Sequence, residues 1–184
     1  MLWRVVAALV VASAAALRPV ASRRAALVGG AASVLVGGRA PAVAISGGGK
    51  DYAEADLRGA DFSGQTLNSK DFSGADGVDA IFANSKLRGA RFFKADMERA
   101  DFSGADLTSA SLEGCNLTGA SLRGAVAEGA AFSKTIADAR DIRDVDFTDA
   151  VIQPYTQKEL CARADASGTN PATGVGTRDS LFCP

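Results

Sequence analysis

The sequence predicts an all-β solenoid because two regular columns of side chains run through it. Every fifth residue from Tyr52 to Ile152 is apolar, and all but three of these are large. Two residues before each of them lies a second column, in which alanine dominates. A period of five residues fits neither a strand nor a helix, whose side chains repeat about every 2.0 and 3.6 residues. The repeat must therefore be a short unit that turns and stacks on itself.

Residues 1–44 precede this repeat and have the composition of a cleaved targeting leader. An early arginine, an apolar run and a small-residue stretch ending at Ala16 have the plan of a secretory signal peptide. A second signal follows, with Arg23-Arg24 before an apolar stretch and an A-x-A cleavage site at residues 42–44. The series resembles the import address of a thylakoid lumen protein in an alga with a secondary plastid. The alternative is one long bacterial or secretory leader that contains an Arg-Arg pair by chance.

Charge and hydropathy restrict the partners of the mature chain. All 21 acidic residues lie at or after Asp51, whereas five of the 20 basic residues lie in the first 44 positions. Removal of the leader leaves 15 basic and 21 acidic residues, a net charge of −6. Such a chain repels phosphate backbones, so we expect no nucleic-acid partner. Each apolar run of the leader is shorter than the roughly 20 residues needed to cross a bilayer, so we also expect no membrane span in the mature form.

The pentads themselves carry a family resemblance. Ala55-Asp56-Leu57, Ala60-Asp61-Phe62 and Ala95-Asp96-Met97 resemble the A(D/N)LXX unit of the pentapeptide repeat family, in phase from residue 51 to 152. That family folds as a right-handed quadrilateral β-helix, with one pentad on each side of a square coil. The resemblance implies about five coils over residues 45–152, in which residues twenty apart stack.

Stacking at this interval predicts inner columns that differ in how well they are filled. One column is nearly all large and contains Phe82, Phe102 and Leu122. Another is small at Gly77 and Ala137, so we expect local opening to begin at those two levels.

On the outside of the coils, the residue before each central position is often acidic. Stacking predicts a ladder of Asp56, Asp76 and Asp96, which could bind calcium or a basic partner surface. The family implies that these side chains bond local backbone groups instead, so we predict no metal site. Phe93 follows a core position and is expected to point outward. Phe93 and the three aspartates form the candidate interaction surface.

Catalytic chemistry is poorly represented in this sequence. Histidine is absent, which removes the commonest general base and metal ligand. No Gly-x-Ser-x-Gly or Cys-x-x-Cys motif occurs, and Cys115 lies in the small inner column, where a thiol behaves as a small hydrophobe. The sequence therefore predicts no enzyme, no catalytic residue and no cofactor.

Residues 153–184 end the repeat and are expected to form a short helical C-terminal cap. Thr156 to Glu159 has the spacing of a capping box, which predicts a helix through about Arg163, and residues 177–181 offer one more helical turn. The tail also resembles that of plant and algal thylakoid lumen pentapeptide proteins. Those tails carry a cysteine at the places of Cys161 and Cys183, which implies a disulfide between these two residues. Three cysteines allow three pairings by number alone.

These observations favour a non-enzymatic pentapeptide-repeat protein of the thylakoid lumen that acts as a protein-interaction or structural module. Its partner would be a lumenal or thylakoid-membrane protein that the sequence does not identify. One alternative is a redox-responsive regulator that acts through Cys161 and Cys183. The other is a DNA mimic that inhibits a topoisomerase, a role that the short stack, the mild charge and the lumenal address disfavour.

Overall fold

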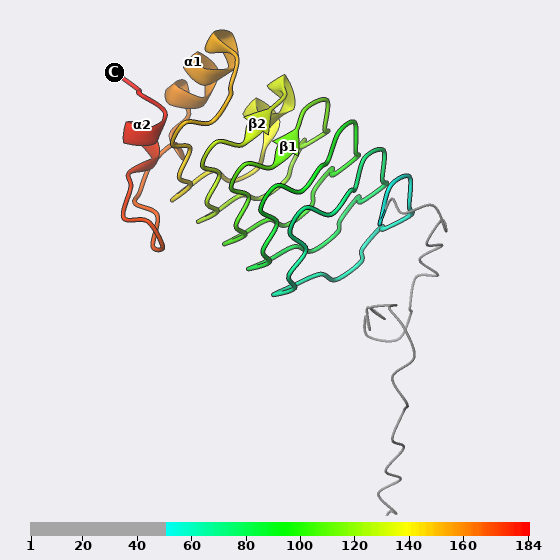
Figure 1. Cartoon of the computed structure of the whole chain (residues 1–184). Helices are drawn as coiled ribbons and strands as arrows, with labels where there is room; N and C mark the ends of the chain where they lie inside the picture. Colours follow the sequence, from blue (N-terminus) through cyan, green and yellow to red (C-terminus); the bar gives the residue numbers. More distant parts are fainter. Residues whose placement is uncertain (1–50) are drawn as a thin grey trace, which may run out of the picture. The chain divides into compact units, whose positions relative to one another are not determined.

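The computed structural model describes residues 51–184, and the predicted leader at residues 1–44 lies outside this described part. Within it, the chain winds through a stack of coils and then enters two helices and an irregular tail (Figure 1). The helices and strands are β1 (Ser111–Leu112), β2 (Ala131–Phe132), the 3-10 helix η1 (Lys134–Asp138), α1 (Pro154–Ala162) and α2 (Thr177–Ser180). Among residues 51–184, no helix has the length and apolarity needed to cross a membrane.

Successive coils are joined by parallel backbone pairing between residues twenty positions apart. Strand β1 pairs with β2, and isolated parallel bridges extend the same pattern from Asp56↔Asp76 to Ala131↔Val151. Twenty residues are four pentads, so the stacking interval is the one predicted. Few residues belong to formal strands because the chain turns after each pentad, which leaves only one or two residues of each side free to pair.

The turn after each central residue requires a left-handed backbone conformation. Gly114 adopts it with a φ of 67°, and Lys94, one coil earlier, adopts it with a φ of 55°. A Cβ atom on Gly114 would lie 3.2 Å from Cγ of Lys94. Glycine therefore relieves both the backbone strain and the crowding between neighbouring coils at this position.

Two columns of phenylalanine rings form the centre of the core. In one column, Phe82 stacks on Phe62 at 4.9 Å between ring centroids and on Phe102 at 5.0 Å. In the other, Phe72 stacks on Phe92 at 4.8 Å. The columns meet edge to face, with 5.7 Å between the centroids of Phe82 and Phe92. Both ring arrangements are favourable beyond the area that they bury, and the interior is filled by side chains.

The structure contradicts the expectation that the core is loose at Gly77 and Ala137. A Cβ atom at Gly77 would lie 2.5 Å from Sδ of Met97, because the flexible thioether of the next coil occupies that space. At the position of Ala137 the chain forms η1, and Ile136 rather than Ala137 is buried. The five-residue register therefore shifts by one residue at η1, and a larger side chain fills the column.

The start of α1 also differs from the prediction. The helix begins at Pro154, two residues before the expected capping residue Thr156. Proline is favoured in the first helical turn because its missing N–H group would have no helical partner there. The hydroxyl of Thr156 is buried without a hydrogen-bond partner among the described residues, so the capping box does not form. Helix α2 lies where the sequence predicts a helical turn.

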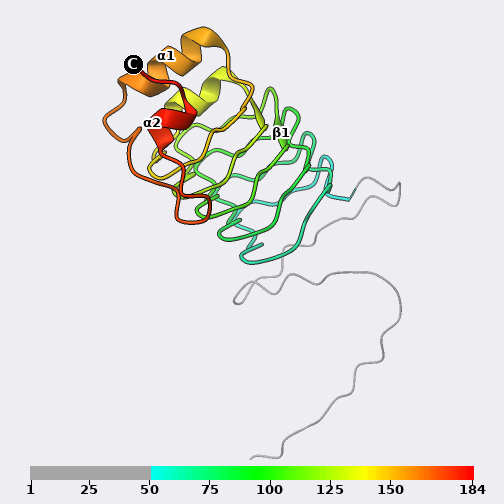
Figure 2. The same ribbon diagram turned by 60° about the vertical axis from the view of Figure 1, so that its left-hand side comes forward.

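The tail packs on the last coils, and both helices lie at that end of the stack (Figure 2). Leu160 and Leu181 are buried in the same core as the repeats. The amide nitrogen of Asn170 donates to the carbonyl oxygens of Ala125 at 2.9 Å and Asp144 at 2.8 Å. The bond to Asp144 satisfies a carbonyl oxygen of the last coils, whereas the carbonyl oxygen of Ala125 also accepts from the N–H of Asp146 one coil later.

Candidate functional site

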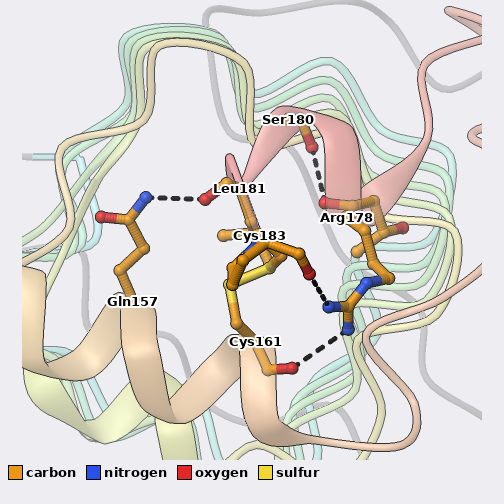
Figure 3. The surroundings of a disulfide bond; sticks show 8 residues. Gln157, Cys161, Arg178, Ser180, Leu181 and Cys183 are labelled. Atoms are coloured by element: carbon orange, nitrogen blue, oxygen red, sulfur yellow. Dashed lines mark hydrogen bonds between the residues drawn. A yellow bond between two sulfur atoms is a disulfide. The ribbon is translucent and has the colours of Figure 1, made fainter.

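A disulfide ties α1 to the end of the chain. Cys161 of α1 and Cys183 are bonded through their sulfur atoms, with 5.4 Å between their Cα atoms (Figure 3). Arg178 of α2 donates from Nη1 to the carbonyl oxygen of Cys161 at 3.1 Å and from Nη2 to the backbone oxygen of Pro184 at 3.0 Å. Gln157 donates from Nε2 to the carbonyl oxygen of Leu181 at 2.6 Å. We call this disulfide and its flanking bonds the clasp.

Cys115 lies apart from the clasp, inside the coils. Its side chain is fully buried and its thiol is free. Burial raises the pKa of the Cys115 thiol far above its ordinary value, and the nearby charge of Asp96 raises it further. Because the thiolate is the reactive form, this residue lacks the setting of a nucleophile.

We therefore expect the Cys115 thiol of the folded chain to stay unmodified by iodoacetamide at pH 8, a pH at which exposed thiols react. Unfolding in guanidinium without reductant should expose this thiol and allow one modification per chain. Mass spectrometry of the intact chain measures both states. Rapid labelling of Cys115 in the folded chain would contradict its assignment to the core.

The carboxylates of the predicted ladder are stacked and bonded locally. Bridges join Asp56 to Asp76, Asp76 to Asp96 and Asp96 to Asn116. Oδ1 of each aspartate accepts the backbone N–H two residues later, at 3.3, 3.5 and 3.2 Å in chain order. Asn116 donates from Nδ2 to Oδ1 of Asp96 at 3.0 Å. These are the Asx-type bonds that the resemblance implies, and they commit one oxygen of each carboxylate to the local fold.

Arg58 adds charge pairing to this ladder. It donates from Nε to Oδ2 of Asp76 at 2.6 Å, and this hydrogen bond holds the pKa of Asp76 below its ordinary value. Within residues 51–184, no group of three or more cysteine or acidic side chains is arranged to hold a metal ion.

Phe93 does not share a surface with this ladder. Phe93 is 44% exposed, and Nζ of Lys94 lies 5.1 Å from the centroid of its ring, which is within the range of a cation–π contact. The pentad of Phe93 pairs through Arg91 with Ser111, whereas the ladder belongs to the following pentad. The candidate interaction surface is therefore divided between two neighbouring sides of the coils.

Sequence reasoning missed a groove beside the clasp. We call it the tail groove; its volume is about 440 Å³, and its lining includes Pro154, Lys158, Cys161, Arg178, Phe182 and Pro184. Phe182 is 78% exposed, the highest value among the large hydrophobic residues of the described part. The only sequence signal for the tail groove was an aromatic residue, Phe182, directly before a tail cysteine.

The coils, the alternating small and large inner columns and the Asx bonds define a repeat protein built from pentads. The profile of the family described as Pentapeptide repeats matches this chain in eight copies, over residues 55–92, 100–137 and 114–153. The chain belongs to the pentapeptide repeat family, and its fold is that family's right-handed quadrilateral β-helix. Members of this family are generally non-catalytic structural repeat proteins.

Several solved structures resemble the chain. A pentapeptide repeat protein from the thylakoid lumen of Arabidopsis thaliana is 41% identical, with a TM-score of 0.65 over 70% of this chain and 88% of that one. HetL, from the cyanobacterium Nostoc, is 24% identical with a TM-score of 0.39, over 53% of this chain and 47% of that one. QnrB1, a plasmid-mediated fluoroquinolone resistance protein, is 19% identical with a TM-score of 0.30, over 51% of this chain and 61% of that one. No curated protein sequence matches significantly.

Proposed function

We propose that this protein is a non-enzymatic module of the thylakoid lumen that acts through protein contacts or as a structural element. The observation that carries the proposal is the similarity to the Arabidopsis lumen protein, which extends over 88% of that protein's length. The leader predicted at residues 1–44 is consistent with the same compartment.

The architecture supports a binding role over a catalytic one. Stacked rings and alanines fill the interior of the coils, and the carboxylates on the surface are bonded to their own backbone. A regular solenoid offers flat, repeated sides, which suit contacts with another macromolecule. We further propose about five coils in residues 45–152 and a C-terminal cap in residues 153–184.

Crosslinking in intact thylakoids, followed by mass spectrometry, tests this proposal. We expect the mature chain to be recovered from the lumen, covalently linked to one or a few specific proteins. Recovery from the stroma, or the absence of any reproducible crosslink at lumenal concentrations of the chain, would contradict it. An in-organello import assay with Arg23 and Arg24 replaced by lysine tests the leader separately, since twin-arginine transport depends on those residues.

Phe93 provides a direct test of the predicted surface. Phe93→Ala should leave the melting temperature nearly unchanged, because the side chain is exposed, and should reduce recovery of the crosslinked partner. Ile81→Ala is a matched control, since Ile81 is 37% exposed on another side of the coils. Equal recovery for both variants and the wild type would show that Phe93 is not part of the docking surface.

A redox-responsive regulator is the second candidate, and the clasp is the observation that favours it. Cys161 is only partly buried, so its disulfide lies near the surface, where a thiol reductant can reach it. Crosslinking under oxidising and reducing conditions distinguishes this candidate from a constitutive module, because only a regulator should change its partners with the redox state.

A further inference from the structure

We infer that the tail groove is a docking site for an acidic peptide segment of a partner protein, one that carries an apolar side chain next to a carboxylate. This inference rests on the proposed interaction function and adds to it a site and a class of partner. It places this additional docking site at the end of the stack, separate from the sides that carry Phe93 and the aspartate ladder.

The shape of the groove fits a peptide side chain. Its volume of about 440 Å³ lies between α1 and the chain end, beside the clasp. Pro154, Ala162 and Phe182 contribute its apolar lining. A concave, largely apolar site with a small number of polar groups is the usual form of a peptide or ligand pocket.

Phe182 is presented to solvent in an unfavourable backbone conformation. Its φ is 53°, a left-handed value that is rare for a bulky residue. Its N–H donates to the carbonyl oxygen of Asp179 at 3.0 Å, and the N–H of Cys183 donates to that of Arg178 at 3.0 Å. These two bonds form a Schellman motif at the end of α2, and the left-handed residue of this motif places the Phe182 side chain outward beside the disulfide.

The positive charge of the groove lining favours an acidic partner segment. The groove is lined by Lys158 and Arg178 and by no acidic side chain. Among residues 51–184, the side-chain ammonium group of Lys158 takes part in no ion pair or hydrogen bond, whereas the Arg178 side chain donates to backbone oxygens of the clasp. The same part of the chain has 14 basic and 21 acidic residues, so a cationic groove stands out from an acidic surface. Lys158 is thus available to a carboxylate of the bound segment.

Titration of the purified full chain with a fluorescent synthetic peptide tests the inference. The probe is a short peptide with one tryptophan flanked by glutamates, and the control peptides replace the glutamates with lysines or the tryptophan with glycine. We expect saturable binding, measured by fluorescence anisotropy, for the acidic tryptophan peptide and at least about tenfold weaker binding for both controls. In NMR spectra, the perturbed amides should be those of α1 and residues 178–184.

Two variants locate the site, and each has a matched control on the coils. Phe182→Ala should weaken binding by about tenfold or more, whereas Ile81→Ala, at an exposed apolar residue of the coils, should not change it. Lys158→Glu should weaken it by about threefold and reduce its salt dependence, whereas Lys134→Glu should not. Reduction of the disulfide should weaken binding, because it releases the segment that holds Phe182. Circular dichroism melting confirms that each variant is folded.

No saturable binding, equal binding of the lysine peptide, or binding that neither Phe182→Ala nor Lys158→Glu changes would overturn the inference. These outcomes are separable from failure of the proposed function. If thylakoid crosslinking recovers a partner while the groove binds no acidic peptide, only the groove assignment fails. If the peptide binds while no lumenal partner is recovered, only the lumenal role fails.

Discussion

Phe102→Asp is expected to unfold the coils, with a loss of at least about 5 kcal/mol in the free energy of unfolding. The ring of Phe102 has no exposed surface and contacts Phe82 and Phe92. Truncation of a buried phenylalanine typically costs about 3–5 kcal/mol, and an unpaired carboxylate in its place adds a desolvation cost. The sum is comparable with the roughly 5–15 kcal/mol that stabilises most domains.

Phe93→Asp is the matched control, because it makes the same chemical change two pentads earlier, at a residue that is 44% exposed. It should change the free energy of unfolding by less than about 1 kcal/mol. Urea unfolding followed by circular dichroism measures both variants. Similar midpoints for Phe102→Asp and Phe93→Asp would contradict the assignment of inward and outward positions, and with it the five-residue register.

Reduction of the disulfide between Cys161 and Cys183 is expected to loosen residues 153–184 while the coils stay folded. The bond spans 22 residues, and closing a loop of this size stabilises a fold by about 3 kcal/mol in the chain-entropy description. The effect should be local, because in a solenoid each unit contacts only its neighbours. Hydrogen exchange with and without reductant measures it, and a Cys161→Ser/Cys183→Ser double variant controls for effects of the reductant itself.

Peptide mapping of the non-reduced chain addresses the pairing separately. The expected crosslinked peptide joins the segments around Cys161 and Cys183 and leaves Cys115 free. A bridge to Cys115, or free thiols at both tail cysteines after air oxidation, would refute the pairing. If the bridge is present and tail exchange is the same after reduction, the clasp is structural and the redox-regulator candidate fails.

The sequence by itself determined the repeat and its stacking. The strict five-residue period predicts a short unit that turns and stacks, and the family resemblance of its pentads implies four pentads to a coil. The pairing of Asp56 with Asp76 and of Ser111 with Ala131 follows from that coil. The outward position of Phe93 and the local bonding of the aspartates follow from the same register, because each pentad repeats one backbone geometry.

Only the tertiary structure decided the departures from this period. Whether Gly77 leaves a gap depends on the rotamer of Met97 one coil away, and the burial of Ile136 instead of Ala137 depends on a helical turn at η1. The tail groove could also be found only from the tertiary structure. Its lining comes from α1 and the chain end, which the disulfide and the bonds of Arg178 bring together, and no periodic pattern relates residues from these two segments.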